Sequence, residues 1–179
     1  MTWKPGLQKI ADLIQAAELQ QIVADRRVAQ LLLEDAANHL STAATAMSSG
    51  DLSGAYQLAY DALRKSAAGL LEAQGLRATS RGGHIAIEEA VVAQFGTTVL
   101  AFRSFGRIRR ARNRFEYPTT IAPGPSREDI DDAIAVATQA RDAAATILEQ
   151  DLLTTWQQRL PADQPAGKPP GVERPRSLE

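Results

Sequence analysis

The sequence predicts an all-α, up-and-down bundle of four to five helices, and three observations support this fold class. The composition is rich in Ala, Leu and Gln while aromatic residues make up 5% of the chain, a bias that favours helices over strands. Apolar residues recur at spacings of three and four along several segments. The connections between these segments are short, which is typical of antiparallel neighbours in a bundle.

Two helices are expected in the first third of the chain. A short amphipathic helix is expected over residues 6–20. Its apolar face consists of Leu7, Ile10, Leu13 and Ile14. A long helix is expected from about Ala24 to Ser48, and Gly50 ends it. We therefore assign residues 1–20 to an N-terminal helical extension and residues 21–153 to the bundle itself.

Three further elements follow in the middle of the chain. A helix is expected to begin after the N-cap residue Asp51 and to end at Gly75. A polar loop is expected over Leu76–Gly83, followed by a shorter helix over His84–Phe95. A fourth strong helix is expected over Thr98–Glu116, and it must end before the next proline because the residue before a proline disfavours the helical conformation.

The last helix is expected over Arg127–Asp151. Ser126 and Asp129 resemble a capping box in which Asp replaces the usual Glu. After Leu160 the composition changes, because five of the nine prolines lie in residues 161–179. Such a segment cannot bury enough apolar surface to offset its ordering entropy, so we expect a disordered, Pro-rich C-terminal tail.

Composition also excludes several kinds of site. The chain has no cysteine, which removes disulfides, zinc–thiolate sites and thiol catalysis. Potential metal ligands do not cluster, so we expect no metal and no cofactor. The first residues lack the pattern of a secretory signal and no apolar run could span a bilayer, so we expect a cytoplasmic protein without a membrane partner. The formal net charge of −1 carries no information about partners.

The segment Phe105–Tyr117 places a charged residue on a helix face that is otherwise apolar. Steps of about 100° per residue put Arg112 on this face. The apolar residues of the face are Phe105, Ile108 and Phe115. Because an unpaired buried guanidinium is costly, we expect Arg112 to meet Glu116 one turn away, a carboxylate on another helix, or an anion in a shared cleft.

The opposite side of the same helix is basic. It consists of Arg103, Arg107, Arg110 and Arg114. From Phe95 to Pro118 the chain has six arginines against one glutamate, a local net charge of +5. This basic row is a candidate for nucleic-acid binding because guanidinium groups match phosphate oxygens, and a solvated helix face is the simpler alternative. For Arg112 with Asn113 and Glu116, a structural ion-pair network and an anion site both stay open.

These residues resemble the HEPN superfamily of small helical bundles, in the form common in actinobacteria. The resemblance covers about Ala24–Asp151 and rests on the helix Ala59–Gly75, the loop Arg81–His84 and the segment Arg109–Pro118. The pair Arg112–Asn113 is its most specific part. It implies a bundle that often dimerises and, in active members, a metal-independent ribonuclease site where two copies of the fourth helix meet.

The family motif is Arg, a polar residue, three variable positions and then His. Arg112 and Asn113 match the first two positions, and Tyr117 stands at the position of the His. The implied catalytic residues are Arg112, Asn113 and Tyr117, with Arg109, Glu116 and His84 in support. A phenol with a pKa near 10 is a poor general base, so Tyr117 is expected to donate a hydrogen bond to phosphate. His84 is either a second contributor to this cleft or a helix-start residue that packs locally.

Three functions stay open at this point. The first is an RNA-directed protein, a metal-independent endoribonuclease of a toxin–antitoxin or defence system with a composite site at a homodimer interface. The second is a non-catalytic module that binds RNA, a nucleotide or a partner protein such as a cognate antitoxin, which the Tyr at position 117 favours. The third is a purely structural dimerisation domain in which Arg112 and Glu116 form a buried pair.

Overall fold

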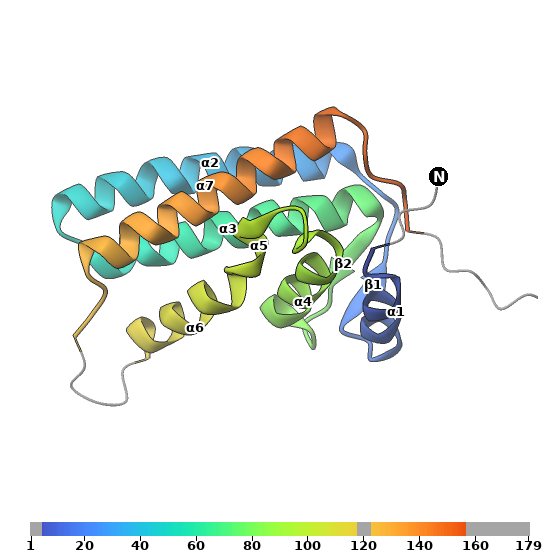
Figure 1. Cartoon of the computed structure of the whole chain (residues 1–179), viewed down its shortest axis with the longest axis horizontal. Coiled ribbons are helices and arrows are strands. Elements are labelled where there is room, and N and C mark those ends of the chain that lie inside the picture. Colours follow the sequence, from blue (N-terminus) through green and yellow to red (C-terminus); the bar gives the residue numbers. More distant parts are fainter. Residues whose placement is uncertain (1–4, 118–122, 157–179) are drawn as a thin grey trace, which may run out of the picture.

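The computed structural model describes residues 5–117 and 123–156, and these form two layers of helices (Figure 1). The upper layer contains the long helices α2 (Arg26–Ser49), α3 (Leu52–Gln74) and α7 (Arg127–Glu149). The lower layer contains α1 (Leu7–Gln15), α4 (Gly83–Phe95), α5 (Leu100–Arg103) and α6 (Phe105–Glu116). Helix α3 contacts α2 and α7 in its own layer and α4 and α6 in the other. The predicted all-α bundle is confirmed.

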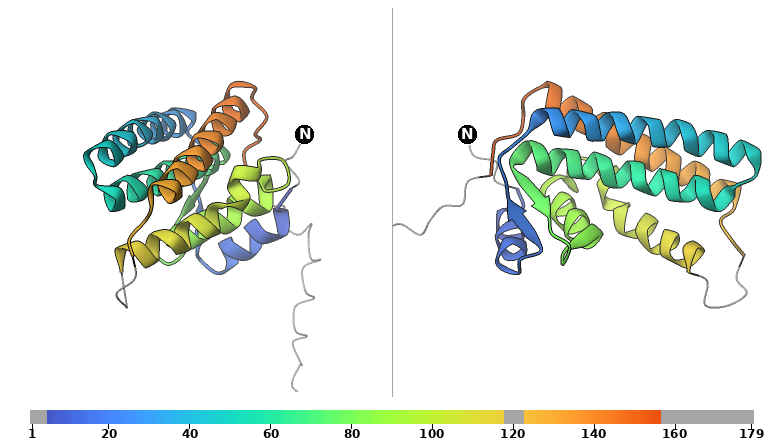
Figure 2. Two further views of the ribbon diagram at one scale, coloured as in Figure 1. Left: turned by 60° about the vertical axis from the view of Figure 1, so that its left-hand side comes forward. Right: turned by 180° about the vertical axis from the view of Figure 1, so that it is seen from behind.

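The ends of the long helices follow the predicted signals. The side chain of Asp51 accepts a hydrogen bond from the backbone N–H of Gly54 at 2.8 Å, which caps α3. Gly50 and Gly75 have φ of 90° and 77° and end α2 and α3 in the left-handed conformation that glycine favours. Ser126 and Asp129 form the expected capping box at the start of α7. Figure 2 shows α2 and α3 as neighbours joined by the turn at Gly50.

The expected helix over residues 6–20 is wrong in its second half, because α1 ends at Gln15. Ala17 then adopts a left-handed conformation with φ of 57°, which stops the helix. The strand β1 (Leu19–Gln21) follows and pairs antiparallel with β2 (Leu76–Ala78), where only a polar loop was expected. Leu19 and Leu76 are both buried, so the pairing buries two leucines and satisfies backbone groups at once.

The expected single helix over residues 98–116 is also wrong, because the chain turns at Ser104 and separates α5 from α6. The N–H of Ser104 bonds to the carbonyl of Ala101, three residues back, at 3.1 Å, so the helix tightens there. Phe102 and Phe105, on either side of the turn, are both fully buried. The turn lets α5 pack on α7 while α6 packs on α3, which straight helical geometry would not allow.

One hydrophobic cluster connects the two layers. It includes Ile10 and Leu13 of α1, which packs on α4. The side chains of Gln74 and Gln94 exchange two hydrogen bonds of 2.8 and 3.1 Å inside it, so these buried amides are satisfied. The expected disordered tail, residues 161–179, lies outside the described residues. None of the helices described over residues 5–117 and 123–156 is long and apolar enough to cross a membrane.

Candidate functional site

Arg112 lies between α6 and α3, with its side chain turned inward as the spacing predicted. The side chain is 17% exposed, and its Cζ atom lies 5.7 Å from the ring centroid of Tyr60 on α3. Ile108, one turn earlier, and Phe105, two turns earlier, are fully buried and fix the face of α6 that packs on α3. A guanidinium over an aromatic ring gains a cation–π attraction, which offsets part of its lost hydration.

The guanidinium of Arg112 is held by three groups of its own chain. Its Nε donates to Oε1 of Gln57 on α3, and one terminal nitrogen donates to Oδ1 of Asn113 at 3.2 Å. The other terminal nitrogen forms an ion pair with Glu116, one turn further along α6. Of the three partners expected for Arg112, the one present in the structure is therefore Glu116. The ring of Tyr117 lies 5.9 Å from Cζ of Arg112 but is 66% exposed.

A small pocket opens beside this guanidinium at the start of α3. It has a volume of 180 Å³ and is lined by Ser53, Gly54, Tyr56, Gln57, Arg112, Phe115 and Glu116. The N-terminus of a helix carries a partial positive charge, and Asp51 already caps this one through Gly54. The pocket therefore combines a guanidinium, a helix start and the Glu116 carboxylate, and the carboxylate is the group that an incoming anion would displace.

The structure places His84 close to the same site. Its Nδ1 lies 2.8 Å from the hydroxyl oxygen of Tyr60, the residue that also lies beneath Arg112. Tyr60 is fully buried, and this burial raises the pKa of its hydroxyl to about 12. Burial of the imidazole, followed by the nearby Arg64 guanidinium, lowers the pKa of His84 below 6.5. His84 is therefore largely neutral near pH 7 and belongs geometrically to the Arg112 neighbourhood.

Sequence reasoning missed the residues of α3 and α4 that complete this neighbourhood. These are Gln57, Tyr60, Asp61, Arg64 and Glu88. Arg64 pairs with Asp61 at 3.0 Å, and Arg109 pairs with Glu88 at 2.6 Å. The signal was present on α3, where Gln57, Asp61 and Arg64 repeat at helical spacing.

Gly106 allows Glu88 to reach its partner on α6. A Cβ atom at this position would lie 2.4 Å from Oε1 of Glu88. The glycine thus lets the carboxylate approach the backbone of α6 and meet Arg109, whose side chain is 20% exposed. Each arginine that faces the Tyr60 hydroxyl and His84 is consequently paired: Arg64 with Asp61, Arg109 with Glu88, and Arg112 with Glu116.

The basic row of Arg103, Arg107, Arg110 and Arg114 is exposed, as expected. Arg107 pairs with Asp132 of α7 at 2.7 Å. Cζ of Arg114 lies 5.9 Å from the ring of Phe115. Within the described part of the chain, Arg103 and Arg110 form no ion pair. Arg114 is exposed and forms no ion pair there either, so the part of the row without a carboxylate partner consists of Arg103, Arg110 and Arg114.

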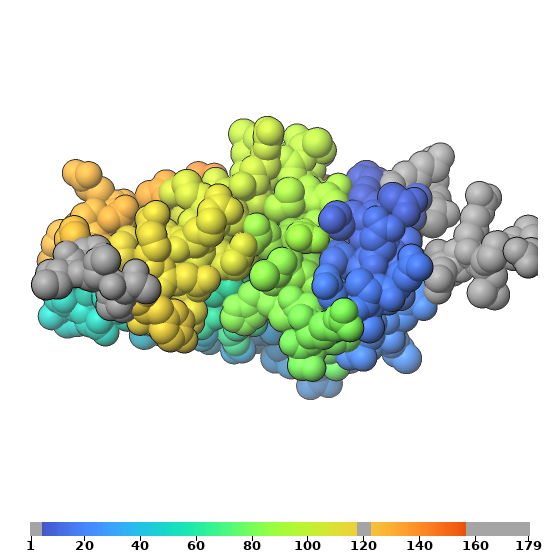
Figure 3. Space-filling model, turned by 90° about the horizontal axis from the view of Figure 1, so that it is seen from below, coloured from blue at the N-terminus to red at the C-terminus, as the bar shows by residue number. Residues whose placement is uncertain are grey.

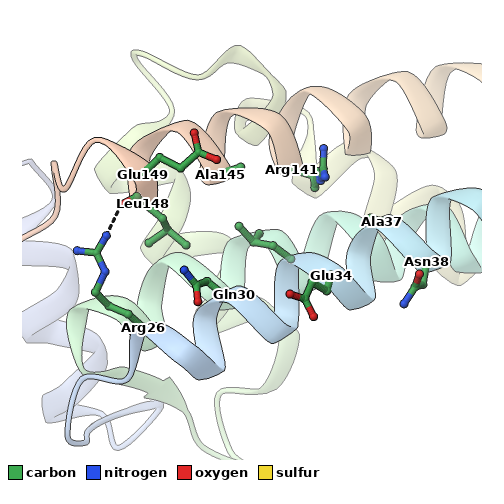
Figure 4. Close-up of a pocket in the computed structure, with 10 residues that line it drawn as sticks. Arg26, Gln30, Glu34, Ala37, Asn38, Arg141, Ala145, Leu148 and Glu149 are labelled. Carbon is green, nitrogen blue, oxygen red and sulfur yellow. Dashed lines mark hydrogen bonds between the residues drawn. The ribbon is translucent and has the colours of Figure 1, made fainter.

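A larger groove lies between α2 and α7, away from this site (Figure 4). It has a volume of 710 Å³, and its rim carries two basic and two acidic residues: Arg26, Arg141, Glu34 and Glu149. Arg26 is already engaged by Asp151 and by the carbonyl of Leu148. Because opposite charges alternate around the groove, it does not present the concentration of cations that the Arg112 neighbourhood and the basic row share.

Comparisons with protein-family models, with curated proteins and with solved structures found no match to the chain. The resemblance to the HEPN superfamily therefore stays a prediction that rests on the residues quoted above. In residues 5–117 and 123–156, no group of three or more His, Cys, Asp or Glu side chains lies together in a way that could hold a metal ion.

Proposed function

We propose that this chain binds phosphate groups of RNA or of a nucleotide at the Arg112 pocket, as its resemblance to HEPN proteins implies. One observation carries the proposal: Arg112 is largely buried at the edge of a pocket, while its ionic partner Glu116 is 38% exposed and belongs to the same helix. The side chain of Glu116 can rotate into solvent without any change in the fold, and this rotation would free the Arg112 guanidinium for a ligand.

The energetics favour an exchangeable partner. Ion pairs between residues one turn apart on a helix contribute only about 0.3–0.5 kcal/mol. A phosphate offers more acceptor oxygens than a carboxylate and matches the guanidinium fork with two parallel hydrogen bonds. Gln57 and Asn113 hold the Arg112 guanidinium in place from two sides, so little side-chain entropy remains to be lost when a phosphate binds.

The basic row would extend this contact along a nucleic-acid strand. Arg103 and Arg110 are exposed and form no ion pair within the described residues, so both can neutralise phosphates. Binding through such contacts depends steeply on salt. The proposal places the chain in the cytoplasm, where RNA is accessible.

The test is fluorescence anisotropy with a labelled single-stranded RNA at low salt. Arg112→Gln is expected to weaken binding about tenfold or more, since hydrogen bonds to charged groups are worth about 1.5–3 kcal/mol. The matched control is Arg141→Gln, which removes the same charge from the groove between α2 and α7 and should leave affinity within about twofold. Equal affinities of the wild type and Arg112→Gln, or no binding at any salt concentration, would contradict the proposal.

A second candidate function, a module that acts through a second copy or a partner protein such as an antitoxin, is favoured by the surface of α4 and α5. Ile85, Val92 and Leu100 are 50%, 36% and 67% exposed. Helix α4 has apolar residues on all sides, which is typical of a helix that is covered all round. Figure 3 shows α4, in green, on the face of the lower layer that is turned away from the long helices.

We expect a homodimer through this surface. Leu100→Asp should convert it to a monomer while leaving the fold intact, because the side chain is mostly exposed. Light scattering coupled to size-exclusion chromatography measures the mass directly. If the wild-type chain is a monomer at high micromolar concentration, the homodimer is excluded. The second candidate function would then require a partner protein.

A further inference from the structure

The groove between α2 and α7 combines an apolar lining with polar walls. Its volume of 710 Å³ lies within the ordinary range of small-molecule sites, about 300–1,000 Å³. The apolar residues that line it are Leu33, Ala37, Ala145 and Leu148, and the two leucines are buried. Figure 4 shows these residues between polar side chains of the two helices. The lining can therefore cover the hydrocarbon part of a ligand.

Both arginines of this groove are already neutralised by acids of the same chain. Arg26 pairs with Asp151 and donates a second hydrogen bond to the carbonyl oxygen of Leu148. Arg141 pairs with Asp142, the next residue of α7, at 2.5 Å. An anionic ligand would therefore have to displace a carboxylate from either guanidinium before it could bind there.

The remaining polar groups of the groove are acceptors without a partner. Glu34 of α2 and Glu149 of α7 line the two walls, and neither side chain has an ion pair or a hydrogen bond within residues 5–117 and 123–156. The side-chain carbonyl of Gln30, one turn before Glu34, has no donor in the same part of the chain. With the arginines neutralised, the groove keeps two uncompensated negative charges, which favour a dication or a polycation.

The two free carboxylates lie at different points along the groove (Figure 4). Glu149 follows Leu148, whose carbonyl oxygen accepts from Arg26 at the start of α2. Glu34 lies eight residues beyond Arg26, which corresponds to about 12 Å at the rise of an α-helix. A ligand that meets both carboxylates must therefore carry its terminal cations at about this separation, with hydrocarbon between them.

We infer that this groove binds a linear aliphatic polyamine of the length of spermidine. The terminal nitrogens of extended spermidine are about 11 Å apart, as ordinary bond lengths dictate. Its terminal ammonium groups would meet Glu34 and Glu149, and its inner one would meet the carbonyl of Gln30. Ammonium groups donate and do not accept, so they match the free acceptors. The methylene groups would lie on the apolar lining, as lysine stems lie on apolar surfaces.

The first experiment compares two dications that differ in length. Octamethylenediamine spans about 11 Å between its nitrogens and putrescine about 6 Å. Calorimetric titration of the full chain at low salt should give the longer diamine an affinity about tenfold or more higher, because it alone reaches both carboxylates. Equal affinities of the wild-type chain for the two diamines, or no binding of octamethylenediamine and spermidine, would overturn the inference.

Two substitutions separate the carboxylates from the longer hydrocarbon chain. Glu34→Gln and Glu149→Gln should each lower the affinity for octamethylenediamine about tenfold and remove most of its advantage over putrescine. The matched control is Glu128→Gln, which removes an exposed carboxylate at the other end of α7 and should leave both affinities within about twofold. All three side chains are exposed, so the fold should persist, and thermal melts without ligand verify this. A length preference that survives in both groove variants would overturn the inference.

The groove and the Arg112 pocket share no residue, so the two proposals can fail separately. Arg112→Gln should bind spermidine as the wild type does, whatever its affinity for RNA. Binding of an oligolysine peptide without binding of any diamine would overturn the polyamine assignment and indicate a site for a basic peptide.

Discussion

At the scale of single residues, the pair Arg112–Glu116 separates a structural role from a binding role. If Glu116 only stabilises the fold, its loss leaves a guanidinium that is 17% exposed without its ionic partner, and stability falls. If Glu116 occupies the place of a phosphate, its loss removes a competitor and affinity rises. The two interpretations predict opposite leading effects for one substitution.

We predict that Glu116→Gln strengthens binding of single-stranded RNA by about 1.4- to fivefold, the range that corresponds to an exposed ion pair of about 0.2–1 kcal/mol. Gln keeps the length of the side chain and removes only its charge. Anisotropy titrations of the two proteins measure the effect, and thermal melts monitor the fold. Unchanged affinity together with a large fall in melting temperature would favour the structural dimerisation domain.

Features that depend on one helix alone could be predicted from the sequence, whereas contacts between different helices could not. The inward direction of Arg112 followed from its spacing to Phe105 and Ile108, which is a property of one helix. Its contact with Gln57 depends on how α6 sits against α3, and helical periodicity contains no such information. The same limit applies to the contact between Tyr60 and His84, which come from different helices.

At the scale of secondary-structure elements, two glycines that both have a positive φ but different surroundings allow a controlled comparison of stability. Gly50 and Gly75 both have positive φ, but a Cβ atom would meet nothing within 4 Å at Gly50 and would lie 2.8 Å from the carbonyl oxygen of Ile22 at Gly75. We predict that Gly50→Ala costs about 1–2 kcal/mol, the ordinary cost of a left-handed residue. Gly75→Ala should cost distinctly more, because backbone must move as well.

Urea denaturation measures both variants against the wild type. The difference between them isolates the steric contribution at the junction where α3 leads into β2. Equal losses of stability would show that the backbone near Ile22 can move at little energetic cost. The close approach at Gly75 would then contribute nothing to the difference in stability.

The capping box of α7 gives a prediction with a pH dependence. Ser126→Ala should cost about 1 kcal/mol at neutral pH. Hydrogen bonds from the backbone and side chain of Ser126 lower the pKa of the Asp129 carboxyl below its ordinary 3.8. A lowered folded-state pKa contributes stability above 3.8 that is lost as the pH falls through the folded-state value. The difference between the thermal melts of the two proteins should therefore begin to narrow as the pH falls below 3.8, and a constant difference down to about pH 2 would contradict this.

The elements themselves were predictable to different degrees. Helices α2, α3 and α7 have long apolar stripes and clear caps, so their existence and ends followed from local rules. The turn at Ser104 could not be predicted in this way, because a continuous helical pattern runs through it. The break is required only by the burial of Phe102 and Phe105 against different neighbouring helices. The pairing of β1 with β2 joins segments over 50 residues apart, which no local signal encodes.

At the scale of the whole molecule, the arrangement in two layers determines which arginines remain free. Helix α6 directs Arg107 toward α7, Arg109 toward α4 and Arg112 toward α3, and each of them meets a carboxylate. Arg103 and Arg110 are left exposed. A net charge of −1 gives the molecule as a whole little attraction for RNA, so the proposed binding would depend on the few cations that the packing leaves unpaired.

This distinction predicts unequal contributions within the basic row. Binding to a single strand loses affinity with salt at a slope of about 0.7 per neutralised phosphate. Arg110→Gln should therefore reduce the slope of log affinity against log salt by about 0.7, since this guanidinium is free to meet a phosphate. Arg107→Gln should reduce the slope by clearly less, because Asp132 already pairs with Arg107 at 2.7 Å. Titrations from about 20 to 200 mM salt measure both slopes, and equal changes would show that the pair with Asp132 opens when RNA binds.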